Sequence, residues 1–450
     1  MDRVVRVSAH TMAGYGGREE RRLVQEHLAT HADRRMSLSR QWSDLVAEVR
    51  TLDGFEHFRR PLTAAELREA ARNGPVVAVN VARSRCDAIV VRPDAIASVP
   101  LDGLTAVDIH TVALRYVEAI EHHQISLDTL DEARAEAAAT PNATTYRAYQ
   151  RAAQDALRAE AAMQDVLNIT LAWLWDTIVE PVFMACGLAG PPPSGTAWPR
   201  LWWCPTGMLT LLPLHAAGRH TEPGHSAMDR AVMSYAPTLR SLLEVRSSAI
   251  ESPEGRMLFV AMPHTPGQTA LPQVRREQHL LGALFGTDGL TTLEGSAASR
   301  EEVLRALRDH DRVHFSCHAT SHATRPAAGG VLLADGLLSV AELAADHQPR
   351  AFAFLSACKT GLGGIVLPDE AMALSAALHF TGFRHVIATL WSVEDNAAAE
   401  VTEGVYRCLF AGGTFTVEDA ALALHRAVLE LRARSPERPS IWMAYTHTGP

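Results

Sequence analysis

Two short apolar runs, each ending in a reactive side chain, constrain this 450-residue chain most. They are residues 312–318, Arg-Val-His-Phe-Ser-Cys-His, and residues 351–358, Ala-Phe-Ala-Phe-Leu-Ser-Ala-Cys. Each run has the length and composition of a buried strand in an α/β sheet. Residues just past the carboxyl ends of such strands face the ligand crevice. If the two strands are neighbours, His318 and Cys358 meet there as an acid/base group and a nucleophile, which indicates cysteine-peptidase chemistry.

Composition excludes several other classes of function. The net charge of −9 argues against a nucleic-acid-binding surface, because no basic patch dominates the chain. The six cysteines are scattered without CxxC spacing, which disfavours a disulfide framework or a zinc finger. Lys359 is the single lysine, so no Walker A loop exists, and neither G-x-S-x-G nor G-x-G-x-x-G occurs. No cofactor is predicted.

Hydropathy predicts a cytoplasmic protein. The chain has no uninterrupted apolar run of eighteen or more residues, and its N-terminus lacks the apolar core of a signal peptide. We therefore expect neither a membrane span nor secretion.

The chain is expected to divide near residues 190–196, Gly-Pro-Pro-Pro-Ser-Gly-Thr, because consecutive prolines cannot propagate a helix. Residues 1–189 read as a helical N-terminal region with a short β element at about 76–91. Within it, residues 18–60 and 107–186 have helical patterns, and the second is broken near 140–142.

Residues 197–450 alternate strands with helices, as in a parallel sheet covered by helices on both faces. The fold class predicted is therefore α/β. The expected strands are 201–204, 257–262, 291–293, 313–317, 351–355 and 385–390. The expected helices are 238–245, 273–285, 299–308, 370–379, 396–409 and 417–432. Residues 331–338 read as a hairpin around Asp-Gly that stands beside the His318 site as a flap.

Six segments, in order, carry a resemblance to a known family. They are Cys204–His215, Ser234–Leu239, Val313–His318, Leu355–Gly361, Pro368–Ala371 and Gly382–Trp391. Together they resemble the CHAT family, the caspase-like peptidases related to separase, from about Leu201 to Trp442. The resemblance implies a caspase-like, mostly parallel sheet, cleavage of protein substrates, and a catalytic dyad of His318 and Cys358. It also implies a degenerate caspase-like half upstream, to which the strands at 76–91 would belong.

The resemblance also assigns neighbouring residues. The residue after the family's catalytic histidine is commonly glycine, whose N–H helps to bind the oxyanion, and here it is Ala319. Alanine can donate the same N–H if its φ is not positive. Lys359 follows Cys358 where the family often has an acidic or polar residue.

By resemblance to separase, Asp395 would line the pocket for the substrate residue before the cut. A carboxylate there would favour arginine or lysine. Asp369 and Glu370 are rival sources of that charge.

Two alternatives stay open. The cluster His314, Cys317, His318 and His322 could bind a metal, although its spacing matches no structural zinc pattern, and no metal is predicted. The chain could also be a catalytically inactive caspase-like scaffold that uses the fold for binding.

The favoured hypothesis is a regulated effector peptidase, with bacterial defence or signalling as its setting. Its partners would be a protein substrate encoded nearby and a regulatory protein, with no nucleic acid and no membrane.

Overall fold

The computed structural model describes residues 34, 36–53, 55, 58–247, 255–320, 328–345, 348–356, 374–391, 393 and 395–450. The chain forms two compact units, Met1–Thr63 and Ala64–Pro450. In the first unit, residues 36–49 are helical, which agrees with the helical pattern seen there in the sequence. Every element named below belongs to the second unit.

An eleven-stranded sheet organises the described part of the second unit, in the order β3-β2-β1-β4-β5-β14-β13-β12-β8-β6-β7. The strands are β1 (Val76–Val81), β2 (Cys86–Val91), β3 (Ile96–Pro100), β4 (Arg200–Pro205), β5 (Val232–Tyr235), β6 (Met257–Ala261), β7 (Leu290–Glu294), β8 (Arg312–Ser316), β12 (Arg350–Ser356), β13 (Phe383–Thr389) and β14 (Tyr445–Thr448). The run β7-β6-β8-β12-β13 is parallel throughout, and β14 is antiparallel to β13. The predicted mostly parallel α/β sheet is confirmed.

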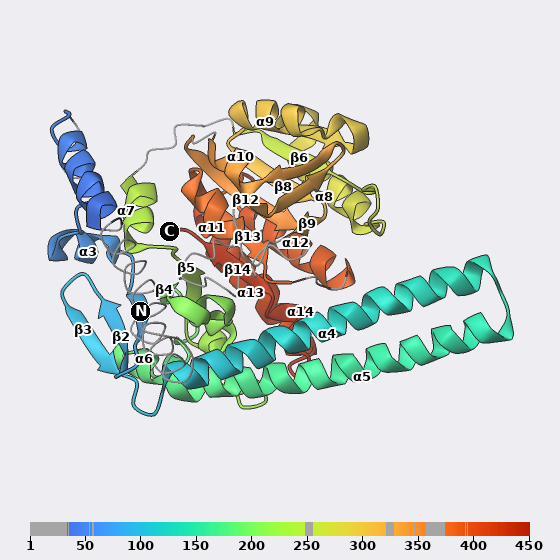
Figure 1. Cartoon of the computed structure of the whole chain (residues 1–450), viewed down its shortest axis with the longest axis horizontal. Coiled ribbons are helices and arrows are strands. Elements are labelled where there is room, and N and C mark those ends of the chain that lie inside the picture. The colour runs from blue at the N-terminus through green and yellow to red at the C-terminus, as the bar shows by residue number, and fades with distance from the viewer. Residues whose placement is uncertain are drawn as a thin grey trace, which may run out of the picture. The chain divides into compact units, whose positions relative to one another are not determined.

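Helices cover both faces of the sheet, because successive side chains of its apolar strands point to opposite sides. Phe352 and Phe354 of β12 pack in one buried cluster, whereas Ala353 and Leu355 pack in another. The first cluster includes residues of α8 (Gln273–Gly289), α12 (Asp395–Leu409) and α13 (Ala420–Arg434). The second includes residues of α9 (Arg300–Arg308), α10 (Val340–Ala345) and α11 (Leu374–Phe380). Side chains of β12 therefore contribute to two cores, and Figure 1 shows helices on both sides of this part of the sheet.

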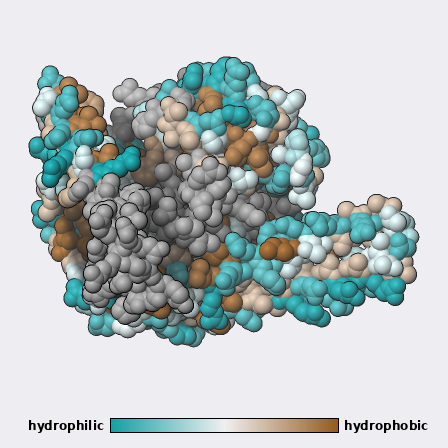
Figure 2. Space-filling model, viewed as in Figure 1, coloured by the Kyte–Doolittle hydropathy of each residue, from teal (hydrophilic) through white to brown (hydrophobic). Residues whose placement is uncertain are grey.

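The helical pattern at 107–186 forms a long antiparallel hairpin, α4 (Ala106–Ala139) and α5 (Ala143–Leu174), drawn plainly in Figure 1. Asn142 ends the break at 140–142 by capping α5, with Oδ1 accepting from the N–H groups of Thr144 at 2.8 Å and Thr145 at 3.1 Å. The face of the hairpin in Figure 2 is largely hydrophilic. A π-helical turn, Trp175–Val179, continues α5 into α6 (Glu180–Ala185).

The continuous helical run Ala143–Ala185 is long and apolar enough to cross a bilayer by length and composition. Half of its most apolar window is buried inside the protein, however. Trp175, Ile178 and Phe183 lie in the main core cluster. A core helix is buried in this way, so the length and composition of this run are only weak evidence for a membrane span.

The β element at 76–91 joins the same sheet as the C-terminal strands. Val76 to Val79 of β1 pair in parallel with Trp202 to Pro205 of β4. The sheet therefore includes strands from both sides of the proline-rich segment 190–196, while the division into domains there stays a prediction.

The sheet has two halves, β3 to β5 and β14 to β7, which meet between β5 and β14. We call this junction the seam, and it is narrow because a single residue pair joins the two strands in the ladder. In the ladder, Thr448 pairs with Tyr235, and the N–H of Gly449 donates to the carbonyl of Tyr235 at 3.1 Å. Polar side chains extend this seam: Ser234 Oγ lies 2.7 Å from His447 Nδ1, and His447 Nε2 lies 3.0 Å from His385 Nδ1. Burial, before any neighbouring charge, lowers the pKa values of His385 and His447 well below the usual value, so both rings are neutral.

His215, the last residue of the segment Cys204–His215, also makes contacts at the junction of β5 and β14. Its Nδ1 lies 2.9 Å from the hydroxyl of Tyr235, and its Nε2 lies 3.0 Å from the carbonyl of Met443. Burial lowers the pKa of His215 to about 4. The contacts give this histidine a structural role in joining β5 to the segment before β14.

Candidate active site

The two strands singled out in the sequence are neighbours. β8 and β12 are parallel, and the pairing runs from Arg312 with Phe352 to Ser316 with Ser356. Their carboxyl ends are therefore in register, and positions 318 and 358 each follow by two residues. The sequence predicts that His318 and Cys358 share one crevice if the two strands are neighbours, and β8 and β12 are neighbours. His318 is described, whereas Cys358 lies in 357–373, outside the described residues.

His318 is held by a main-chain carbonyl. Its Nε2 lies 2.8 Å from the carbonyl oxygen of Thr269, in the segment between β6 and α8. A carbonyl can only accept, so Nε2 carries the proton in this contact, and Nδ1 is the nitrogen left to act as a base. The side chain is buried, with 9% of its surface exposed. The imidazole is thus fixed in the tautomer that can take a proton at Nδ1.

Ala319 begins the short strand β9 (Ala319–Thr320), which pairs with β10 (Gly330–Leu333). Ala319 is opposite Val331, and the N–H of Leu332 donates to the carbonyl of His318 at 2.8 Å. This register makes Ala319 and Val331 a non-hydrogen-bonded pair, so the N–H of Ala319 points away from β10. Among the described non-glycine residues, Arg59 alone has a positive φ. The backbone of Ala319 therefore meets the condition for an oxyanion donor.

The predicted hairpin stands beside His318. β10 and β11 (Gly336–Ser339) pair antiparallel, and Leu333 is opposite Gly336. Val331, Leu333 and Leu338 are buried in the core cluster that includes α9 and α10. The hairpin is thus packed against the core and hydrogen-bonded to the main chain of His318.

A buried carboxylate lies beneath the ends of both strands. Glu277 of α8 is 1% exposed. Its Oε2 accepts from Ser316 Oγ and, at 3.4 Å, from His314 Nε2. Its Oε1 accepts from Ser356 Oγ at 2.6 Å and from Thr402 Oγ1 at 3.3 Å. Four donors thus occupy the lone pairs of one carboxylate.

These donors set the charge of Glu277. Burial is the largest effect and would raise its pKa, but His314 and the hydroxyls of Ser316 and Ser356 together lower the pKa below its usual value. His314 Nδ1 lies 2.9 Å from the hydroxyl of Tyr406 on α12. Burial, followed by the charge of Glu277, raises the pKa of Tyr406 well above its usual value. The group is an ionised carboxylate with a full set of partners.

Sequence reasoning missed Glu277, although a signal exists. Val274, Glu277 and Leu281 are the buried residues of α8, and they lie at positions i, i+3 and i+7. A charged residue in the apolar stripe of an amphipathic helix indicates a buried partner. Thr269 carried no such signal, because its main chain rather than its side chain contacts His318.

Of the three predicted specificity residues, the structure describes the position of Asp395 alone. Asp369 and Glu370 lie outside the described residues, as does Lys359. Asp395 is the first residue of α12, which follows β13, the strand next to β12. Asp395 thus comes after a third parallel strand whose carboxyl end is at the same edge of the sheet.

The residues of the alternative metal site do not converge among the described residues. Both ring nitrogens of His314 have partners, and Cys317 is buried in the apolar cluster on the other face. His322 lies outside the described residues. Among the residues that are described, no group of three or more His, Cys, Asp or Glu side chains could hold a metal ion.

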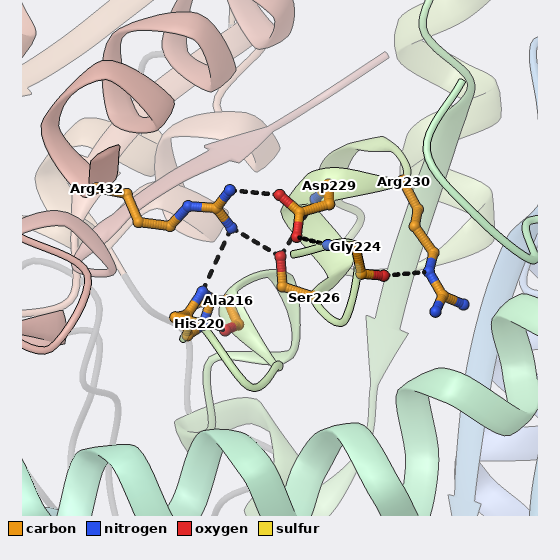
Figure 3. A network of polar contacts seen from close by, with 7 residues as sticks. All are labelled: Ala216, His220, Gly224, Ser226, Asp229, Arg230 and Arg432. Atoms are coloured by element: carbon orange, nitrogen blue, oxygen red, sulfur yellow. Dashed lines mark hydrogen bonds and ion pairs between the residues drawn. The ribbon is translucent and has the colours of Figure 1, made fainter. Parts of the chain in front are cut away.

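A second polar network has a structural explanation (Figure 3). Arg432 of α13 donates to Ser226 Oγ at 2.7 Å and to His220 Nδ1 at 3.3 Å, and it pairs with Asp229. Burial is the largest effect on Asp229 and would raise its pKa, but Arg432, Ser226 and His220 together lower the pKa below its usual value. Burial lowers the pKa of His220 to about 4, so its ring can accept from Arg432. The network fastens the loop between β4 and β5 to α13.

Comparison with solved structures shows the same fold in separase of Saccharomyces cerevisiae. The separase–securin complex at 3.0 Å matches with a TM-score of 0.55 and 11% identity, over 86% of this chain and 30% of that chain. The complex at 2.6 Å matches with a TM-score of 0.54 and 10% identity, over 86% and 31%. The chain thus spans about a third of the separase chain, and the likeness shows a caspase-like fold.

No curated protein matches the chain. The family model described as CHAT domain matches residues 168–450. The match begins upstream of Leu201, within α5, so it includes the end of the helical hairpin and the proline-rich segment. Because this match covers more than half of the sequence, the chain belongs to the family of CHAT-domain proteins.

Proposed function

We propose that this protein is a cysteine endopeptidase in which Cys358 is the nucleophile and His318 is the general base and acid. The observation that supports it best is the alignment of the β8 and β12 ends, Ser316 opposite Ser356, two residues before each member of the dyad. Parallel strand ends of this kind form the ligand crevice of α/β sheets. Membership of a family with a caspase-like fold agrees with this chemistry.

In the proposed mechanism, His318 Nδ1 takes the proton of the Cys358 thiol, and the thiolate attacks the scissile carbonyl carbon. The carbonyl of Thr269, hydrogen-bonded to Nε2–H, stabilises the imidazolium that results. The imidazolium then gives its Nδ1 proton to the leaving amine, and the C–N bond breaks to leave a thioester. Water hydrolyses the thioester with His318 again as base.

The oxyanion of each tetrahedral intermediate would be bound by the N–H groups of Ala319 and Cys358. The N–H of Ala319 points away from β10 and so is available for this contact. A main-chain donor held in a paired strand needs no reorganisation during the reaction.

We propose that the substrate is a protein cut after a basic residue, with Asp395 as the carboxylate that binds it. The support is the place of Asp395 after β13, the third parallel strand of the crevice. A buried guanidinium requires such a partner to offset its desolvation. Asp369 and Glu370 are the alternative carboxylates.

We further propose a regulated peptidase of bacterial defence or signalling, located in the cytoplasm, with a substrate encoded nearby and a regulatory protein partner. The two separase structures are complexes with a protein partner, securin. A screen of proteins encoded near this one, incubated with enzyme and analysed for new termini, tests this proposal.

The dyad is tested by single substitutions. We expect Cys358→Ala and His318→Ala each to abolish cleavage of peptide substrates and labelling by an electrophilic arginyl peptide, because nucleophile and base act as a unit. The circular dichroism spectrum and Tm should stay near those of the wild type. Wild-type protein that neither cleaves nor is labelled would instead support the scaffold alternative, and turnover by Cys358→Ala would place the nucleophile elsewhere.

Specificity is tested with matched Arg, Lys, Asp and Leu peptides. We expect Arg to be preferred, and Asp395→Asn to lower kcat/KM for Arg peptides at least about tenfold, because truncating one partner of a buried charge pair typically costs about 2–5 kcal/mol. Kinetics of Asp369→Asn and Glu370→Gln serve as controls. A preference for Asp peptides, or a profile that changes with a control and not with Asp395→Asn, would refute the pocket assignment while leaving the dyad intact.

A further inference from the structure

We propose that Glu277 is a positioning residue that clamps the ends of the two dyad-bearing strands against each other. This inference rests on the proposed peptidase function, because it assigns Glu277 a role in aligning His318 with Cys358. Glu277 touches neither residue in the described contacts and acts through Ser316 and Ser356.

The geometry of the clamp is symmetric about the pair of strands. Ser316 of β8 and Ser356 of β12 are opposite each other in the ladder, and both hydroxyls donate to the same carboxylate, one to each oxygen. Each serine is the last residue of its strand and precedes a dyad residue by two positions. The clamp therefore lies where strand pairing ends and the catalytic segments begin.

Charge makes this contact stronger than an ordinary hydroxyl pair. Hydrogen bonds to an ionised acceptor are shorter and about twice as strong as neutral ones. Glu277 is 1% exposed and Ser316 is fully buried, so the hydrogen bond between them is shielded from water, whereas Ser356 is partly buried. A shift of one strand end would remove one of the four donors to a buried carboxylate, which favours the observed spacing of the two ends.

Two further groups donate to the same carboxylate. Thr402 of α12 donates to Oε1 at 3.3 Å, and His314 donates to Oε2 at 3.4 Å. Thr402 is as buried as Glu277, at 1% exposure, but it lies on a helix and not on a dyad-bearing strand. Thr402 therefore supplies a matched control: it donates to the same oxygen as Ser356 without linking that oxygen to the dyad.

The experiment compares Ser316→Ala, Ser356→Ala and Thr402→Val, each of which deletes one hydroxyl donor to Glu277. We expect each substitution to lower Tm, because each removes a hydrogen bond to a buried carboxylate. We expect Ser316→Ala and Ser356→Ala to lower kcat per labelled active site about tenfold to a hundredfold, with KM near the wild-type value, because a small misplacement of reacting groups has an effect of this size. Thr402→Val should keep kcat close to that of the wild type.

Glu277→Gln gives the second measurement. It keeps the length of the side chain but replaces one acceptor oxygen with a donor, so we expect a loss of kcat at least as large as that of either serine variant, again without a matching change in KM. Active sites are counted by titration with an electrophilic arginyl peptide, so misfolded protein does not lower the measured kcat. Equal losses of kcat in Ser356→Ala and Thr402→Val, or losses confined to Tm, would refute the clamp.

Alkylation of Cys358 by iodoacetamide separates failure of this inference from failure of the proposed function. If the alkylation rate of wild-type protein is the same in His318→Ala, the dyad is absent, and both proposals fail. If His318→Ala slows alkylation but Glu277→Gln does not, the dyad stands, and the clamp alone is refuted. Slower alkylation in both variants, with Thr402→Val near the wild type, is the result that the clamp requires.

Discussion

Ala319 places a single main-chain N–H where the proposed chemistry needs a hydrogen-bond donor. Its neighbours in β9 and β10 form the ladder, while its own N–H points away from that ladder. A substitution that removes only this N–H therefore leaves the pairing of the strands intact.

The first prediction follows from that orientation. Ala319→Pro deletes the donor, and we expect kcat to fall about 10²–10³-fold, the usual cost of one lost oxyanion donor. Ala319→Gly retains the N–H and should keep most of the activity. Kinetics on an arginyl peptide measure both variants, with iodoacetamide alkylation of Cys358 to verify that the thiol is still activated. Similar activity in the two variants would exclude Ala319 from the oxyanion site.

The sequence predicted His318 as a site residue from its position after an apolar run, and in the structure it follows β8, the strand next to β12, by two residues. The pattern of α8 marks Glu277 as a charged residue in an apolar stripe, but it does not show that Ser316, Ser356 and Thr402 converge on it. Contacts between residues far apart in the chain depend on tertiary packing, which a local pattern does not contain.

Among the elements, the turn into β13 depends on Gly382. Its φ is +106°, and an added Cβ would lie 2.1 Å from the carbonyl oxygen of Gln348. The carbonyl of Gly382 accepts from the N–H of Arg350 at 2.9 Å, at the start of β12. The glycine therefore sets how β12 and β13 begin side by side.

We predict that Gly382→Ala destabilises the protein more than a matched glycine substitution does. Gly413 has a φ of +82° with open space around it, so Gly413→Ala should cost the backbone strain alone, about 1–3 kcal/mol. Gly382→Ala adds a main-chain clash to that strain. Gly412 has open space and is not among the glycines with positive φ, so Gly412→Ala should be close to neutral. Urea unfolding of the three variants ranks them, and equal losses for Gly382→Ala and Gly413→Ala would contradict the clash.

Apolar runs predicted the parallel strands β6, β8, β12 and β13, because these strands are buried on both faces. They did not predict β14, whose sequence Tyr-Thr-His-Thr is polar. Its residues are nevertheless buried, since His447 has partners in Ser234 and His385. Hydrogen bonds to other strands thus replace the hydrophobic signal by which a buried strand is normally recognised.

Considered as a whole, the molecule buries several neutral histidines. Burial lowers the pKa of His379 to about 4 and, with a smaller effect of Arg432, that of His425 to about 3. Burial also lowers the pKa values of His385 and His447 well below the usual value. Each ring is protonated more readily in the unfolded chain than in the folded protein.

The free energy of unfolding should therefore fall as the pH is lowered. These histidines contribute stability above their unfolded pKa of about 6.5, and this stability is lost as the pH falls toward about 4, by up to about 1.4 kcal/mol per pH unit for each ring. We expect His379→Asn to reduce the slope of stability against pH in this window. Urea unfolding from pH 7 to pH 4 measures the slope, and Gly413→Ala is a control that lowers stability without removing a proton site. An unchanged slope in His379→Asn would show that His379 does not contribute to the pH dependence of stability.

The central position of β14 bears on how the chain is synthesised. Residues 445–448 lie between β5 and β13 in the sheet, although more than fifty residues separate them from β13 along the chain and about two hundred from β5. During translation, the earlier strands can associate on the ribosome as they emerge, N-terminal parts first. They cannot be joined into one sheet until β14 has left the exit tunnel. A translation product that stops before residue 445 therefore lacks the strand that unites the two halves, and residues 445–448 must be synthesised before the sheet can be completed.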